Sequence, residues 1–129
     1  MKRIKQFLEA LGLCHTVIIN DKKNENDCIS YNASSPDELA LVNGARHLGF
    51  VFEKRDADGN IHCREQYDDS DNNGVERVYK LLNVIEFDSN RKRMSVIVQT
   101  PEAKILVICK GADSVVEKLL SSNTNLAVT

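Results

Sequence analysis

The sequence lacks the features that usually mark membrane-spanning, secreted or zinc-binding chains. Its longest apolar runs, such as residues 16–19, are far shorter than the roughly 20 residues that cross a bilayer. The N-terminal segment is basic, but Glu9 interrupts the apolar segment that follows it, which argues against a secretory signal. The four cysteines, at positions 14, 28, 63 and 109, form no C-x-x-C pair, and the three histidines are scattered. We therefore expect reduced, mostly buried thiols and no metal site.

Two common nucleotide signatures are also missing. There is no G-x-x-x-x-G-K-[ST] P-loop and no G-x-G-x-x-G turn, so any nucleotide site must be built in another way. The formal net charge is −2, and the basic cluster at residues 91–93 offers too few phosphate contacts for tight nucleic-acid binding. No spacing of cysteines and histidines suggests a catalytic triad. We expect no nucleic-acid partner and no catalytic residue in the chain itself.

The composition is that of an ordinary globular domain. The chain has 129 residues, of which 42% are hydrophobic and 28% are charged, which suits a single domain with one core over residues 1–129. Residues 20–27 are almost wholly polar and predict a loop. Residues 121–129 show no pattern, and we expect this tail to be disordered.

Helical spacing predicts three helices. Residues 3–14 place four apolar side chains on one helical face: Ile4, Phe7, Leu8 and Leu11. Gly12 is a signal for the end of this helix. Ser35 as N-cap and Pro36 as the first helical residue predict the start of a second helix, which Gly49 ends. A third helix is expected to begin near Asp113.

From residue 50 the apolar period becomes that of strands. Strands are predicted at residues 50–54, 61–67, 75–87, 94–100 and 104–109. Met94, Val96 and Val98 would share one face. The strand at residues 104–109 is apolar on both sides, which predicts a central position in the sheet. The fold class is therefore α+β, an antiparallel sheet with helices at its ends and on one face.

The loop at residues 69–74 imitates the start of an EF-hand calcium loop. Oxygen-bearing residues occupy positions 1, 3 and 5, and Gly74 occupies position 6. Lys80, however, stands at position 12, where a bidentate glutamate is required. A hairpin loop accounts better for this segment than a calcium site.

Three short segments carry a family resemblance. They are residues 35–42 (S-P-D-E-L-A-L-V), 86–96 (E-F-D-S-N-R-K-R-M-S-V) and 110–113 (K-G-A-D). In this order and spacing they closely resemble the nucleotide-binding domain of P-type ATPases, in the form typical of the phospholipid flippases. The resemblance covers about residues 1–120. The family's D-K-T-G-T phosphorylation motif is absent, so the resemblance implies a fragment of a larger membrane ATPase.

The resemblance also implies a nucleotide site. Phe87 would stack on the adenine ring, Glu38 would face its amino edge, and Lys110 would line the base of the pocket. Stacking on an aromatic ring and an acceptor for an exocyclic amine are chemically suitable for a base. Without the resemblance, core packing would explain Phe87 and a capping box would explain Glu38.

Three further positions complete the predicted site. Lys92 would approach the phosphates, although it could equally be a solvated charge in a hairpin turn. Gly111 leaves room for close approach of a backbone. Ser89 stands where cation pumps commonly carry an arginine, and it can donate a hydrogen bond but no charge.

The function implied is that of an ATP-binding cytosolic domain of a phospholipid-transporting ATPase. It would hold adenine and present the γ-phosphate to a separate phosphorylation domain, with Mg²⁺ accompanying ATP in the full-length protein. Partners would be the phosphorylation and actuator domains of the same chain, with an accessory subunit as a further candidate. The fragment would neither hydrolyse ATP alone nor insert into the membrane. The alternative is an interaction module that keeps the fold without binding nucleotide.

Overall fold

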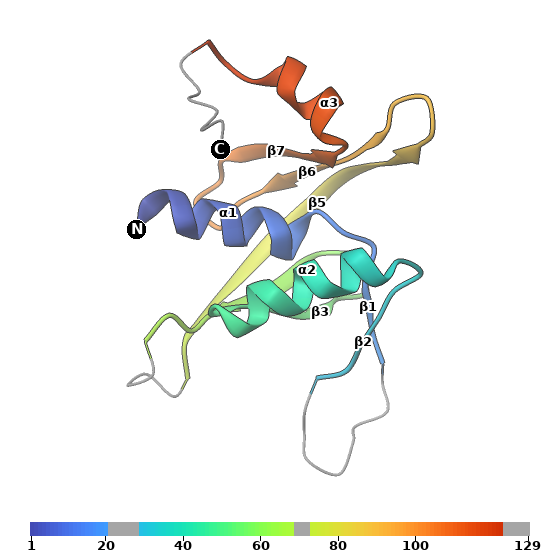
Figure 1. Ribbon diagram of the computed structural model, residues 1–129. Helices are drawn as coiled ribbons and strands as arrows, with labels where there is room; N and C mark the ends of the chain where they lie inside the picture. The colour runs from blue at the N-terminus through green and yellow to red at the C-terminus, as the bar shows by residue number, and fades with distance from the viewer. Residues whose placement is uncertain (21–28, 69–72, 123–129) are drawn as a thin grey trace.

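The computed structural model describes residues 1–20, 29–68 and 73–122, and its main feature is a five-stranded antiparallel sheet (Figure 1). The strands follow one another in space as they do along the chain, in the order β3-β4-β5-β6-β7. Their bounds are β3 Phe50–Arg55, β4 Ile61–Glu65, β5 Val75–Asp88, β6 Arg93–Gln99 and β7 Ile105–Gly111. All five predicted strands are confirmed, with boundaries shifted by one or two residues.

The long strand β5 joins the two halves of this sheet. Its first part pairs with β4, where Tyr79 lies opposite Ile61, and its second part pairs with β6, where Val84 lies opposite Val96. Figure 1 shows β5 running diagonally from the β3–β4 hairpin to the β6–β7 hairpin. The ends of β5 and β7 therefore lie at the same end of the sheet, on either side of the start of β6, where Arg93 pairs with both Asp88 and Gly111.

Two helices, α1 (Lys2–Leu13) and α2 (Pro36–His47), lie on one side of the sheet (Figure 1). The start of α2 is as predicted: Ser35 is its N-cap, its hydroxyl accepts from the amide of Glu38, and Pro36 is the first helical residue. Gly49 follows the helix with a φ of 100°, the left-handed conformation that glycine adopts most easily. The α+β prediction is confirmed.

The core lies between these helices and the sheet. Its members are Leu8, Leu13, Cys14, Val17, Val42, Phe50, Phe52, Ile61, Cys63, Tyr79, Met94, Val96 and Val98. Met94, Val96 and Val98 share the core face, as predicted. Gly12 does not stop α1, which continues to Leu13. A Cβ at Gly12 would lie 2.4 Å from the ring of Phe50, so glycine is needed there for close packing against β3.

The predicted central position of β7 is wrong. It is an edge strand, paired with β6 alone in the sheet order. Ile105 and Val107 are 56% and 68% exposed, while Leu106 and Ile108 pack against the core. An apolar pattern on both faces indicates central burial only when a second layer covers the outer face, and among the described residues these two side chains stay largely uncovered.

Some elements differ from the prediction or lie outside what the structure describes. The two-residue strands β1 (Ile18–Ile19) and β2 (Tyr31–Asn32) pair with each other and are too short to leave a periodic signal. The last helix is shorter than expected, with α3 at Asp113–Val116 and a 3-10 turn at Glu117–Leu119. The predicted polar loop, the EF-hand-like segment, Cys28 and the tail lie mostly or wholly outside the described residues.

Three cysteines belong to the described residues, and all are free thiols. Cys14 and Cys63 are buried, and Cys109 is exposed. Within residues 1–20, 29–68 and 73–122, no group of three or more His, Cys, Asp or Glu side chains is arranged to hold a metal ion. None of the helices described there has the length and apolar character that would take it across a membrane.

Candidate functional site

A cavity of about 750 Å³ opens where the start of α2 meets the ends of β5 and β7. All three segments that carried the family resemblance contribute to its walls. Of the predicted site residues, Glu38, Phe87, Lys110 and Gly111 line it. Thr16 and the buried Met94 line it as well.

Phe87 forms an apolar wall of this cavity, and its ring is open to a ligand. Its side chain is 64% exposed although it belongs to a strand of the main sheet. Leu41, from α2, is also partly exposed in the cavity. The core-packing interpretation of Phe87 is therefore wrong, because a packed core aromatic would be withdrawn from water.

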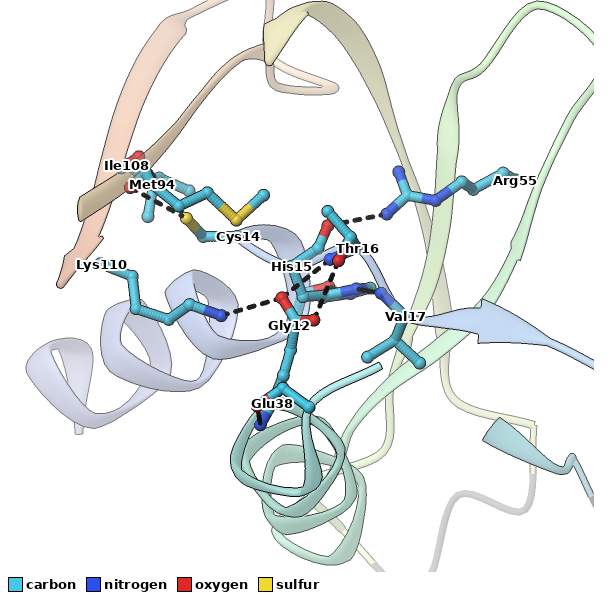
Figure 2. Close-up of polar contacts among 11 residues, drawn as sticks. Gly12, Cys14, His15, Thr16, Val17, Glu38, Arg55, Met94, Ile108 and Lys110 are labelled. Atoms are coloured by element: carbon cyan, nitrogen blue, oxygen red, sulfur yellow. Dashed lines mark hydrogen bonds and ion pairs between the residues drawn. The ribbon is translucent and has the colours of Figure 1, made fainter. Parts of the chain in front are cut away.

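Glu38 forms the polar wall and is only 9% exposed. The amide N–H of Thr16 donates to Oε1 at 2.9 Å, and the Thr16 hydroxyl donates to Oε2 at 2.9 Å. Lys110 Nζ, which comes from β7, lies 3.2 Å from Oε1. Figure 2 shows the carboxylate of Glu38 rising from α2 between these two partners.

The capping-box interpretation of Glu38 is only half right. Its backbone N–H donates to the Ser35 hydroxyl at 3.4 Å, as a capping box requires. Its carboxylate does not turn back to the N-cap but reaches Thr16 and Lys110 instead. The side chain thus contributes to the cavity rather than to the helix end.

The charge state of Glu38 follows from these contacts. Burial raises the pKa of its carboxyl, but the hydrogen bonds from Thr16 and the charge of Lys110 outweigh burial and hold the pKa below its ordinary value. Glu38 is therefore an anion at neutral pH. With Lys110 it forms a partly buried ion pair at the cavity wall.

The chain turns sharply after α1, and the buried ring of His15 holds this turn. Its Nε2 lies 2.8 Å from the Gly12 carbonyl, and the amide of Val17 donates to Nδ1 at 3.1 Å. Because Nδ1 accepts, the hydrogen of the neutral ring is on Nε2 and is donated to Gly12. Burial, assisted by the positive charge of Arg55, lowers the pKa of His15 to about 4. The ring is therefore neutral at physiological pH.

Cys14 fastens the same turn to the sheet. Its Sγ lies 3.8 Å from the Met94 carbonyl and 3.7 Å from the Ile108 carbonyl, on strands β6 and β7 (Figure 2). Burial raises the pKa of this thiol to about 11, so it stays protonated, and its single hydrogen is shared weakly between the two carbonyls. Cys14 and His15 together place Thr16 beside Glu38. Sequence reasoning missed this turn because no motif or periodicity covers it.

Gly111 allows a close approach, but of the protein's own backbone. A Cβ at Gly111 would lie 2.5 Å from the Lys92 carbonyl oxygen and 2.6 Å from Arg93 Cβ. The glycine thus lets β7 pack against the turn between β5 and β6. Lys92 and Ser89 lie in that exposed turn and are not among the cavity-lining residues. The structure brings together four of the six predicted site residues, and these two stand apart.

The charges around the cavity restrict what it can accept. Asp37 and Glu86 line it in addition to Glu38, and Lys110 is the cation among the lining residues. One acceptor site remains on Glu38 Oε2 after its described contacts, since a carboxylate has about four. The cavity therefore suits a flat, uncharged ring with a hydrogen-bond donor, and it disfavours an anionic group.

Comparisons with known proteins identify the family of the chain. The family model described as "P-type ATPase, cytoplasmic domain N" matches residues 3–128. The chain is 48% identical over 120 residues to the Arabidopsis thaliana protein named "Probable phospholipid-transporting ATPase 12", covering 93% of this chain and 10% of that protein. It is 43% identical to the human "Phospholipid-transporting ATPase IC" over 117 residues, 91% of this chain and 8% of the relative. The chain thus spans about a tenth of these relatives' length.

Proposed function

The chain belongs to the P-type ATPases, as their cytoplasmic domain N, and we propose on that basis that its cavity binds ATP by the adenine end. The observation that carries the proposal is the exposed ring of Phe87 on the cavity wall. An exposed aromatic ring is a platform on which a base stacks, a contact worth roughly 1–3 kcal/mol in nucleic-acid complexes.

The polar wall orients the base. The remaining acceptor site of Glu38 Oε2 takes a hydrogen from the exocyclic amine of adenine. Lys110 keeps hydrogen-bonding capacity toward the cavity, because Glu38 is the acceptor that the described residues give to its ammonium group. These contacts prefer adenine to a base that presents a carbonyl oxygen at the same place.

The triphosphate leaves the cavity. Asp37 and Glu86 repel an anion from the walls, whereas Lys92 and Ser89 lie in the exposed turn after β5. Lys92 approaches the phosphates there, and Ser89 offers a hydrogen bond. With so few phosphate contacts, a dissociation constant near 1 mM, about 4 kcal/mol, is expected for the chain alone.

In the longer protein the domain acts by positioning. It is part of a phospholipid-transporting ATPase and presents the γ-phosphate to the phosphorylation domain on the cytoplasmic side, with Mg²⁺ accompanying ATP. Most of the catalytic effect in phosphoryl transfer comes from positioning and charge stabilisation, which requires no catalytic residue here. The phosphorylation and actuator domains are its partners, and an accessory subunit is a further candidate.

An NMR titration with ATP tests the proposal directly. Phe87→Ala should raise the dissociation constant roughly 5- to 150-fold, the equivalent of 1–3 kcal/mol of stacking. Phe7→Ala is a matched control, because Phe7 is 62% exposed but lies on α1 and is not a cavity-lining residue. In the wild type, shifts should cluster at Glu38, Phe87 and Lys110.

Two results would contradict the proposal. Equal weakening by Phe87→Ala and Phe7→Ala would mean that ATP binds nonspecifically to exposed aromatic rings. An absence of any shift at several times the expected dissociation constant would favour the interaction module over a nucleotide site.

A further inference from the structure

We infer that Thr16 is a positioning residue for the nucleotide: its two donors orient the Glu38 carboxylate so that one oxygen holds Lys110 and the other faces the base. This inference rests on the proposed function and adds a residue that belongs to none of the three family segments.

The geometry gives Thr16 control over both oxygens of one carboxylate. Its amide N–H reaches Oε1 and its hydroxyl reaches Oε2, each at 2.9 Å. Two donors from one residue fix the plane of the carboxylate as well as its position. With the plane fixed, Lys110 Nζ meets Oε1 from the other side at 3.2 Å, and the remaining acceptor site lies on Oε2.

Three segments far apart in the sequence meet in this contact. Glu38 is in the first turn of α2, and Lys110 is 72 residues further on, near the end of β7. Thr16 lies between α1 and β1 (Figure 2). Through Glu38, Thr16 connects the turn after α1 to strand β7. It thereby sets the distance between the polar wall and the strand that carries Lys110.

The position of Thr16 is itself fixed by its neighbours. His15 and Val17 are buried on either side of it, and the His15 ring bonds to Gly12 and Val17. Thr16 by contrast is exposed. Its hydroxyl can therefore be removed without leaving a hole in the core, which separates a positioning role from a packing role.

Thr16→Val is the variant that isolates the hydroxyl. It keeps the β-branched shape and the backbone N–H and removes the donor to Oε2. A hydrogen bond to a charged group is among the stronger ones, so we expect the dissociation constant of ATP to rise roughly tenfold. Thr16→Ser restores the hydroxyl and should restore affinity.

A second measurement responds to positioning but not to a general loss of structure. The carboxyl carbon of Glu38, followed by NMR against pH, should titrate at higher pH in Thr16→Val than in the wild type or Thr16→Ser. Lys110 faces this carboxylate from β7, and Cys14, His15 and Arg55 lie within its electrostatic reach. None of these groups is changed by the substitution.

Thr100→Val serves as the matched control. The Thr100 hydroxyl accepts from the Lys104 amide in the turn between β6 and β7, and Thr100 is not among the cavity-lining residues. It should leave ATP affinity and the Glu38 titration unchanged. If Phe87-dependent ATP binding persists and Thr16→Val neither weakens it nor moves the Glu38 titration, this inference is overturned and the proposed function stands. If the wild type does not bind ATP, the proposed function fails and this inference fails with it.

Discussion

Two polar clusters connect the helices to the sheet, and they differ in whether they face the cavity. The site cluster is Thr16, Glu38 and Lys110. The closed cluster is Glu9, Arg77, Tyr79 and Glu102. Both combine at least one carboxylate with a cation, and both include at least one strongly buried member. Composition and burial alone therefore do not distinguish them.

The closed cluster uses its donors internally. The Tyr79 hydroxyl donates to Glu9 at 2.7 Å and accepts from Arg77 Nε at 3.0 Å. The guanidinium of Arg77 also reaches both carboxylate oxygens of Glu102, at 2.6 and 3.0 Å. The site cluster instead keeps an acceptor on Glu38 and donors on Lys110 beside a cavity. Hydrogen-bonding capacity that faces a cavity marks the site, whereas the four residues of the closed cluster are not among the cavity-lining residues.

Removing the centre of the closed cluster should have the largest effect. Tyr79 is fully buried, so Tyr79→Ala should lower the free energy of unfolding by about 3–5 kcal/mol, as measured by urea denaturation. ATP affinity of the folded fraction should not change. If that variant does not fold, Tyr79→Phe, which removes only the hydroxyl, should cost about 1–2 kcal/mol. A change in ATP affinity in Tyr79→Phe would contradict the separation of the two clusters.

His15, which supports the site cluster, should make the protein less stable as pH is lowered. Its pKa is lowered from 6.5 to about 4, so below pH 6.5 the unfolded chain binds a proton that the folded chain does not. Stability is thus fully present above pH 6.5 and falls by about 3 kcal/mol as pH drops to 4. Urea denaturation at several pH values should show this slope in the wild type and not in His15→Gln.

Glu38 in the site cluster and Glu102 in the closed cluster offer a direct comparison of the two. Glu38→Gln removes the charge that Lys110 and Thr16 face, and it should weaken ATP binding and lower stability by about 1–3 kcal/mol at neutral pH. The exposed Glu102→Gln should leave ATP affinity unchanged. Because the pKa of Glu38 is lowered, its contribution is present above the ordinary value of 4.5 and is lost as pH falls through the folded pKa. Calorimetric ATP titration of both variants decides between the clusters.

The comparison also shows which features could be predicted from the sequence. Phe87, Glu38 and Lys110 were found through the family resemblance, and the family match over residues 3–128 confirms that resemblance. Their local chemistry pointed elsewhere, toward core packing for Phe87 and helix capping for Glu38. Neither interpretation takes into account the cavity that the ends of β5 and β7 leave beside α2, because the presence of this cavity depends on the order of the strands in the sheet.

Two other misses have the same origin. Thr16 follows α1 in a turn whose shape comes from the buried ring of His15, and such a turn leaves no period in the sequence. The edge position of β7 follows from consecutive pairing of the strands, whereas its two-sided apolar pattern suggested the centre. Local patterns thus predicted the elements, and long-range pairing decided their surroundings.

The smallest expected effect comes from His62, whose pH dependence should be opposite in sign to that of His15. Its Nε2 lies 3.0 Å from Asp56 and its Nδ1 lies 3.2 Å from Glu76, and the bond to Asp56 raises its pKa above 6.5. Its contribution is present below pH 6.5 and is lost as pH rises through the folded pKa. As pH rises from 6.5 through the folded pKa, the wild type should therefore lose a little stability, and His62→Gln should not. His15 is neutral throughout that window, so equal slopes in the two proteins would mean that the carboxylates do not hold the His62 proton.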